Sequence, residues 1–382
     1  MAAVTRPRLA LLDGLRGVAA LFVIIYHFGE AFATSPETQW LNHGYLAVDF
    51  FFILSGFVLG YAYDSRWAKG LTSRRFILLR IIRLHPMVVL AVLLGAVAYI
   101  IQGSVRWDGT PMPVEALLLS LFLGLLMLPA LPGSMADVRG NNEMFPLNGP
   151  SWSLFFEYIG SIMYALWLRR LSVRYLRLVV LFSAVGIIAV ALGNMSGHYH
   201  IGVGWTLCDY GFFGGFARLS FSFSVGLLMS RNFKPIKVRG AFWICSAIMS
   251  CLFAVPYIGA DTMPWLNACF DIFCTLFIFP LIVYIGASGA MTDSRYTRSA
   301  RICEFFGMLS YPVYMIHYPV MYLFYSWVWF ESLEFEDVWP VCTVIFIALP
   351  MLAAIVARYY DMPLRSLLVK RFTGDKKVIN TD

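Results

Sequence analysis

The strongest constraint on this chain is a series of long apolar segments that recurs along its whole length. Hydrophobic residues make up 60% of the 382 residues and charged residues only 13%, whereas about a quarter of an average globular protein is charged. A helix of about 20 apolar residues can cross the hydrocarbon core of a bilayer. The sequence therefore predicts an all-α polytopic membrane protein, with eleven apolar segments at roughly 11–33, 44–63, 76–102, 114–132, 150–168, 175–193, 208–230, 240–258, 265–286, 303–326 and 338–358.

The positions of the basic residues predict how many of these segments cross. Lysine and arginine favour the cytoplasmic side of a membrane. If segment 114–132 does not cross, every Lys and Arg lies inside except Arg106, Arg139 and Arg218. This asymmetry favours ten transmembrane helices, cytoplasmic termini and a re-entrant or interfacial segment at 114–132. The outer region 103–149 is then expected to cover a cavity, because irregular backbone at membrane depth is tolerated where it lines one.

Net charge and cysteine content exclude other classes of protein. The net charge of +7 does not indicate nucleic-acid binding, because the basic residues lie in short loops between apolar segments. The seven cysteines form no Cys-x-x-Cys pair and no zinc-binding spacing, so we expect no metal site. The chain is interpreted as one membrane domain, residues 1–365, followed by a basic cytoplasmic tail, 366–382.

The first apolar segment, Leu12–Phe28, contains the ionisable residues Asp13, Arg16 and His27. Eleven helical steps bring Arg16 and His27 to within roughly 20° of one face, about 16 Å apart along the axis. Ionisable residues inside a membrane are functional candidates. The alternative is that Asp13 and Arg16 lie at the headgroups while His27 is a satisfied core histidine.

Five motifs in this order resemble those of the acyltransferase-3 family: LDGLRGVAALFVIIYHF, VDFFFILSGFVL, RIIRLHP, SWSLFFEY and SYPVYMIH. The spacing Arg, ten residues, His is the hallmark of that family. The resemblance covers about residues 9–365. It implies a polytopic membrane enzyme that acylates hydroxyl groups, mostly on sugars.

Arginines mark the predicted inner side. Arg80 and Arg83 lie three positions apart at the start of the third segment, where they could simply anchor the helix. Guanidinium groups also bind phosphate oxygens in a bidentate manner, and the resemblance supports a role in binding acyl-CoA, together with Arg16. Ser55 precedes Gly56 near the middle of the second segment, where a glycine lets a backbone or ligand approach, and Ser55 is grouped with the donor-binding residues.

Two carboxylates lie toward the predicted outer side. Asp49 has a structural role, as a cap at the outer end of the second segment or as a partner for His27, or it is itself a catalytic residue. Glu157 lies about two turns inside the membrane. It either forms a structural pair with an arginine such as Arg218, or it has the functional role that the resemblance implies. Trp152 shares the motif of Glu157 and is a candidate substrate-binding residue.

A polar stripe occupies the ninth predicted span. Ser310, Tyr314 and His317 are spaced i, i+4, i+7 on an otherwise apolar helix. Such a stripe indicates the lining of a cavity, so Ser310 and Tyr314 are candidate substrate-binding residues and His317 a candidate catalytic one.

The resemblance implies transfer of an acyl group, with acetyl favoured, from cytosolic acyl-CoA to a hydroxyl of a cell-envelope glycan or other sugar-containing acceptor. His27 is expected to act as general base or as a nucleophile that forms an acyl-imidazole, with Glu157 or Asp49 orienting it. No permanently bound cofactor is expected. The predicted location is the plasma membrane, as in the inner membrane of a bacterium, and the sequence does not reveal the oligomeric state.

Two other classes of function stay open. A transporter of a sugar or lipid-linked intermediate would also contain intramembrane charges, although transporters often have two related halves and this sequence shows no internal repeat. A structural membrane protein would hold its buried charges in inert pairs.

Overall fold

The protein is all-helical in a computed structural model that describes residues 9–260, 262–292 and 298–374. Each predicted apolar segment contains a helix, and no strand occurs in these described ranges. The α-helices are α1 (Ala10–Glu30), α2 (Ala47–Trp67), α3 (Ser73–Ile101), α4 (Val114–Leu125), α5 (Ser151–Leu166), α6 (Val173–Leu192), α7 (Gly211–Arg231), α8 (Ala241–Phe253), α9 (Trp265–Phe273), α10 (Phe279–Thr292), α11 (Arg298–Phe330), α12 (Phe335–Val356) and α13 (Met362–Thr373).

Seven helical stretches among the described residues are long and apolar enough to cross a membrane, as expected for a polytopic membrane protein. They are Ala10–Glu30, Asn42–Trp67, Ser73–Ile101, Val173–Leu192, Gly211–Arg231, Trp265–Ala290 and Phe335–Thr373. The count of ten crossings and the cytoplasmic position of the termini stay predictions.

Segment 114–132 begins with α4, a helix of 12 residues. At 1.5 Å per residue it rises about 18 Å, less than the roughly 30 Å of a hydrocarbon core. Irregular chain follows α4 up to α5, so the segment is one short helix packed on α3 rather than a helical hairpin.

Two parallel helix pairs, α1 with α11 and α2 with α7, form the centre of the bundle. The α2–α7 contact is close because of glycine. A Cβ atom on Gly56 would lie 2.0 Å from the carbonyl oxygen of Phe223, and one on Gly226 would lie 2.0 Å from that of Ile53. The close neighbour expected at Gly56 is therefore the backbone of α7.

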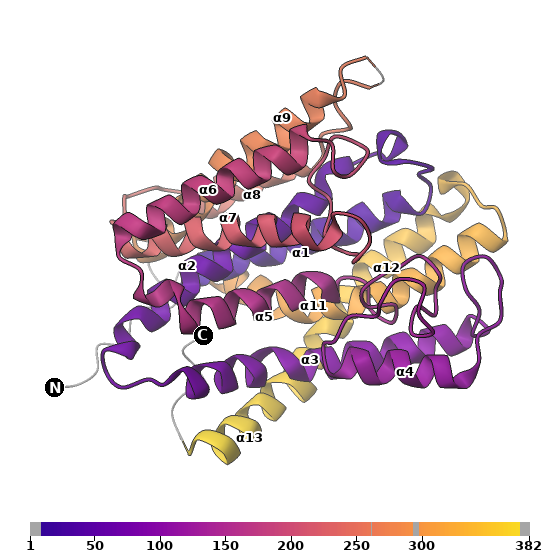
Figure 1. The fold of residues 1–382 in the computed structure, drawn as a ribbon, viewed down its shortest axis with the longest axis horizontal. Coiled ribbons are helices and arrows are strands. Elements are labelled where there is room, and N and C mark those ends of the chain that lie inside the picture. The colour runs from indigo at the N-terminus through magenta and orange to yellow at the C-terminus, as the bar shows by residue number, and fades with distance from the viewer. Residues whose placement is uncertain (1–8, 261, 293–297, 375–382) are drawn as a thin grey trace.

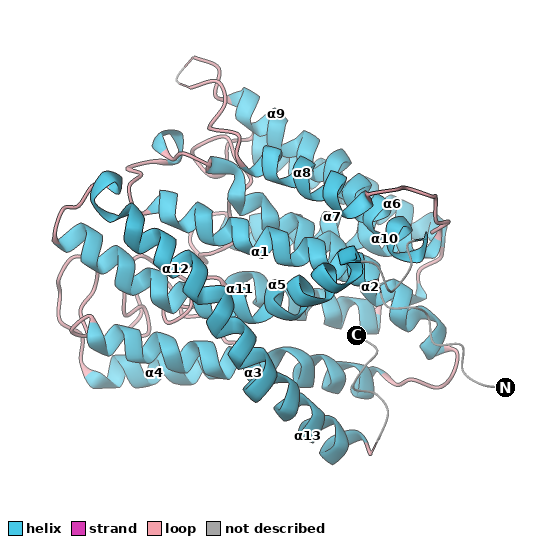
Figure 2. Ribbon diagram, turned by 180° about the vertical axis from the view of Figure 1, so that it is seen from behind, coloured by secondary structure: helices cyan, strands magenta, loops and turns pink. Residues whose placement is uncertain are grey.

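Most of the basic clusters meet at one end of the bundle. Asp64, near the end of α2, pairs with Arg231 at the end of α7, and Arg231 also donates to the backbone carbonyl of Leu171. The long connection between α3 and α5 lies at the opposite end, on the right in Figure 1, while α13 projects at the lower left. Figure 2 shows the same arrangement from behind. The predicted separation of basic and non-basic loops is therefore present in the fold.

The predicted tail begins within a helix. A π-helical turn, Ala357–Asp361, leads into α13, and the buried Asp361 carboxylate accepts a hydrogen bond from Arg365. The predicted basic positions Arg6, Arg8, Arg295, Lys376 and Lys377 lie outside the described residues. The division into a domain and a tail at residue 365 stays a prediction.

Candidate active site

Two adjoining cavities lie inside the bundle. The basic cavity, of about 90 Å³, contains all four predicted donor-binding residues. The aromatic cavity, of about 380 Å³, is lined largely by tryptophan and tyrosine and contains His27. Val48 of α2 and Tyr314 of α11 line both cavities, so these two residues mark the boundary between them.

His27 forms a dyad with Glu30 in the last turn of α1. Because the two residues are three positions apart, their side chains lie on the same helix face. His27 Nδ1 lies 2.7 Å from Glu30 Oε2, and the Tyr325 hydroxyl donates to the same carboxylate at 2.8 Å. With Nδ1 engaged, Nε2 is the imidazole nitrogen that remains for chemistry in the aromatic cavity.

His317 lies behind His27 and does not line either cavity as the structure describes them. The two imidazole rings stack with centroids 5.3 Å apart. His317 is fully buried, and its Nδ1 lies 3.1 Å from the carbonyl of Val313. The predicted cavity-lining stripe therefore holds for Ser310 and Tyr314 but is wrong for His317, because the helix rotation turns its ring toward α1.

Asp49 forms a buried ion pair with Arg218 of α7. The guanidinium donates through Nε at 3.1 Å and through a terminal nitrogen at 2.7 Å, and another terminal nitrogen donates to the carbonyl of Val203. Arg218 also lies over the Trp152 ring, 5.2 Å from its centroid. In the described chain Asp49 lines neither cavity, and it holds Arg218 rather than His27.

Glu157, predicted to belong with the proton-transferring groups around His27, lies instead in the basic cavity. Its carboxylate pairs with Arg80 at 2.5 Å and accepts a hydrogen bond from Ser55 at 3.1 Å. The expected partner Arg218 is occupied by Asp49. The hypothesis that Glu157 or Asp49 orients the imidazole is therefore wrong on geometry, since Glu30 occupies that position.

The basic cavity gathers three guanidinium groups around one carboxylate. Arg16 of α1 donates from Nε to Ser310 Oγ at 2.8 Å, and Arg80 and Arg83 enter from α3. Arg80 Nε is buried without a hydrogen-bond partner among the described residues. Arg16 also pairs with Asp13 at 3.3 Å, and the charge of Arg83 acts on Asp361. Three guanidinium groups in the wall of one cavity are suited to binding anionic oxygens, phosphates above all.

Tyr314 is held in place at the boundary between the cavities. Its hydroxyl lies 2.6 Å from Ser153 Oγ and 3.3 Å from the carbonyl of Pro150. The ring of Phe51 meets the Tyr314 ring edge-on, with centroids 5.6 Å apart. These contacts link α2, the start of α5 and α11 at the point that any molecule passing between the cavities must cross.

The outer region 103–149 covers the aromatic cavity, as expected, and supplies Trp107, Asn141 and Glu143 to its wall. Burial raises the pKa of the Glu143 carboxyl, and the positive charge of Arg139 offsets part of that rise. Sequence reasoning missed Glu143, and nothing in a long irregular loop distinguishes it. Glu30, also missed, could have been found from its spacing of three from His27.

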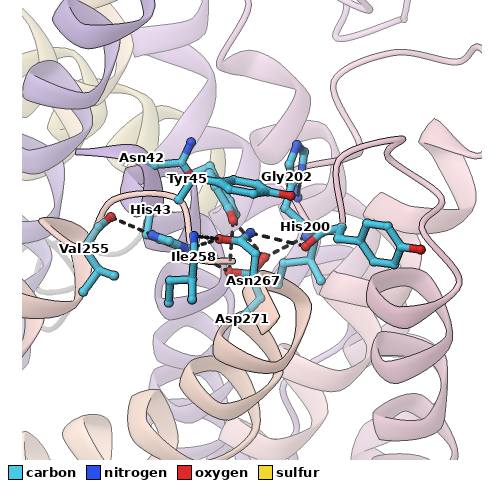
Figure 3. Close-up of polar contacts among 12 residues, drawn as sticks. Asn42, His43, Tyr45, His200, Gly202, Val255, Ile258, Asn267 and Asp271 are labelled. Carbon is cyan, nitrogen blue, oxygen red and sulfur yellow. Dashed lines mark hydrogen bonds and ion pairs between the residues drawn. The ribbon is translucent and has the colours of Figure 1, made fainter. Parts of the chain in front are cut away.

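A buried polar cluster supports another wall of the aromatic cavity (Figure 3). Asp271 of α9 accepts hydrogen bonds from the Tyr45 hydroxyl at 2.8 and 3.0 Å and from the backbone N–H of Ile201 at 2.9 Å. Asn267 of α9 lies 3.0 Å from the ring of His43. These contacts fix Tyr45, whose ring lines the cavity, and the loop between α6 and α7.

The arrangement combines an anion-binding cavity with a cavity that contains an oriented imidazole. A His–carboxylate pair can accept a proton and stabilise the imidazolium that forms. The geometry therefore suits the transfer of a group from a phosphate-bearing donor to an acceptor that loses a proton at Nε2.

Comparison with known proteins gives one family for nearly the whole chain. A family model described as "Acyltransferase domain" matches residues 9–358. A protein of Rhizobium radiobacter named "Protein 2 in picA locus" is 40% identical over 194 residues, which are 48% of this chain and 95% of that protein. No solved structure matches.

Two relatives with more informative names match over shorter stretches. A Staphylococcus aureus (strain COL) protein, named a candidate O-acetyltransferase, is 35% identical over 97 residues, 24% of this chain and 14% of that protein. The acyltransferase MdmB of Streptomyces mycarofaciens is 31% identical over 172 residues, 42% of this chain and 40% of MdmB.

Proposed function

Because the chain belongs to the acyltransferase family whose model spans residues 9–358, we propose that it is a membrane O-acyltransferase. It moves an acyl group, acetyl in the first instance, from cytosolic acyl-CoA to a hydroxyl of a cell-envelope glycan or another sugar-containing acceptor. We place it in the plasma membrane, which in a bacterium is the inner membrane. The observation that carries this proposal is the contact between an arginine-lined cavity and a cavity with a His–Glu dyad.

The donor enters through the basic cavity in this proposal. Arg16, Arg80 and Arg83 bind the phosphates of the nucleotide, and the pantetheine arm extends toward Tyr314. The basic cavity is smaller than the roughly 300 Å³ of an ordinary ligand pocket, so donor binding has to widen it. Exchange of Glu157 for a phosphate oxygen on Arg80 would supply part of that change.

The acceptor occupies the aromatic cavity, with its reacting hydroxyl beside His27. Nε2 takes the hydroxyl proton as the oxygen forms a bond to the thioester carbonyl carbon. The carbon–sulfur bond then breaks, and the CoA sulfur leaves as a thiol with the proton from Nε2. Glu30 keeps Nδ1 as the protonated nitrogen and stabilises the imidazolium. In an alternative route, Nε2 attacks the thioester carbonyl carbon, the carbon–sulfur bond breaks and CoA leaves as its thiolate. The acceptor oxygen then attacks the acyl-imidazole, its proton passes to the thiolate, and the imidazole is restored.

CoA release from acetyl-CoA by the purified, detergent-solubilised protein tests this proposal. We expect release by the wild type, none by His27→Ala, and a raised acetyl-CoA KM in Arg83→Ala. Each variant is compared with the wild type in thermal unfolding, so that loss of folding is recognised. Substantial activity in folded His27→Ala would refute the assignment of the base. Transport of a sugar without any thioester turnover, with longer acyl donors also inactive, would favour the transporter.

A further inference from the structure

The aromatic cavity has the size and surface of a site for a sugar ring. Its volume of about 380 Å³ falls in the range of ordinary ligand pockets. Four tryptophans line it: Trp107, Trp152, Trp205 and Trp329. The C–H faces of a pyranose are apolar and gain free energy when they pack against such rings, so polar groups in the wall are left to decide which sugar binds.

The charged side chains that line this wall offer no unpaired cation to an anion. Among the described lining residues only Glu30, Glu143 and Arg218 are charged. Arg218 is already neutralised by its bidentate contact with Asp49, and Glu30 is engaged by His27. Arg139, whose charge opposes the raised pKa of Glu143, does not line the cavity as described: its guanidinium lies against the Tyr322 ring, 3.3 Å from the centroid, and donates to the Pro146 carbonyl and to Gln102. A carboxylate or phosphate on the acceptor would therefore meet Glu143 directly, with this cation behind the ring of Tyr322.

Glu143 is a carboxylate held in place by neutral donors. The Tyr322 hydroxyl donates to one of its oxygens and Asn141 Nδ2 to the other at 2.7 Å. Glu143 is only 7% exposed, and none of the ion pairs among the described residues includes it. Arg139 is a neighbouring charge that opposes the raised pKa of Glu143. Burying a carboxylate without full compensation is costly, and hydroxyl or ammonium donors on a ligand would supply the missing hydrogen bonds.

Further acceptor capacity lies beside Glu143. Asn141 Oδ1 is buried at the cavity wall without a hydrogen-bond partner among the described residues. A flipped amide would turn this oxygen toward the Glu143 carboxylate, so the assigned orientation is the favourable one. The unsatisfied group that Asn141 presents at this wall is therefore a hydrogen-bond acceptor, which binds donors and repels anions. A terminal nitrogen of Arg139 is also unsatisfied, but Arg139 does not line the cavity as described.

Glu143 lies on the same wall as the dyad. The Tyr318 ring meets His27 edge-on with centroids 4.8 Å apart, and it meets Tyr322 edge-on at 4.6 Å. Tyr322 in turn donates to Glu143. A sugar that binds Glu143 through one hydroxyl can thus present another toward Nε2 of His27.

From these contacts we infer that the acceptor group in this cavity is a neutral or amino-bearing sugar, and that Glu143 selects it against anionic sugars. The inference rests on the proposed function. It assigns Glu143 and Asn141 to acceptor binding, whereas His27 and Glu30 act on the proton.

Matched pairs of methyl glycosides test this inference, since each pair differs only in a CH₂OH or a carboxylate at C6. The pairs are the gluco, galacto and manno pyranosides with their uronic acid counterparts. The readouts are CoA release above the rate without sugar and the mass of the acetylated glycoside. We expect the wild type to prefer the neutral member by at least tenfold in kcat/KM. Glu143→Gln should reduce that preference at least fivefold, and the exposed Glu336→Gln should keep it.

The preference is a ratio within one preparation, so the fraction of folded enzyme does not affect it. If Glu143→Gln does not fold, the wild-type ratio still tests the sugar class, and Asn141→Ala tests the subsite. Equal use of both members, or an unchanged ratio in Glu143→Gln, would overturn the inference. CoA release that none of the sugars changes would overturn it while leaving the proposed function intact, whereas absence of CoA release from any acyl-CoA would remove both.

Discussion

Replacing Glu30 with glutamine should slow acyl transfer about 30-fold. A carboxylate stabilises an imidazolium about 4 Å away by about 4 kcal/mol at an effective dielectric constant near 20. The Glu30 side chain is 39% exposed, so water screens roughly half of this energy. Loss of the remaining roughly 2 kcal/mol from the transition state corresponds to about 30-fold in kcat.

The assay is CoA release at saturating acetyl-CoA, with a thermal unfolding curve for each variant. The acetyl-CoA KM should stay near the wild-type value, because Glu30 does not line the basic cavity as described. Tyr325→Phe keeps the carboxylate and removes one donor to it, so its effect should be several times smaller. A kcat of folded Glu30→Gln within threefold of the wild type would refute the view that Glu30 orients His27.

Three further predictions concern stability. Gly56→Ala should lower Tm strongly, because the added Cβ would lie 2.0 Å from the backbone of α7. Gly186→Ala should change Tm little, because the atom nearest to its Cβ would be 3.8 Å away. Equal Tm values for the two variants would contradict the packing of α2 on α7. Asp49→Asn should cost about 3–5 kcal/mol in unfolding free energy by leaving Arg218 unpaired, and a variant as stable as the wild type in denaturant unfolding would argue against a buried pair. Burial, with the neighbouring cations, lowers the pKa of His200 to about 3. Between about pH 6.5 and 3 the unfolded chain therefore binds more protons than the folded one, so stability present above pH 6.5 is lost on acidification. His200→Gln should flatten the fall in Tm between pH 7 and 5.

The helices and the polar stripes within them follow from local patterns. Each apolar segment of membrane-spanning length contains a helix, whereas α13 lies beyond the last of these segments and was not predicted. Arg16, Arg80 and Arg83 were grouped from their positions near the basic loops, and the structure brings them into one cavity. Local patterns suffice here because helix formation depends on neighbours three and four residues away, and basic residues cluster near segment ends.

The partners of the buried charges could not be predicted in the same way. Asp49 pairs with Arg218, and Glu157 with Arg80, although each sequence motif is equally compatible with several partners. A rotation of one helix by a single residue, about 100°, turns a side chain from a cavity toward a neighbouring helix. His317 shows the consequence, since its spacing is that of a cavity-lining residue and its ring lies behind His27.

The sequence by itself determined a membrane helical bundle, its family motifs and the histidine at the centre of the proposed chemistry. Only the tertiary structure decided that Glu157 belongs with the arginines, that His317 lies behind His27, and that Glu143 reaches the aromatic cavity from a long loop. The physical reason is the cost of burying charge. Each carboxylate takes the partner that packing brings within hydrogen-bond distance, and packing is a property of the assembled helices rather than of any one segment.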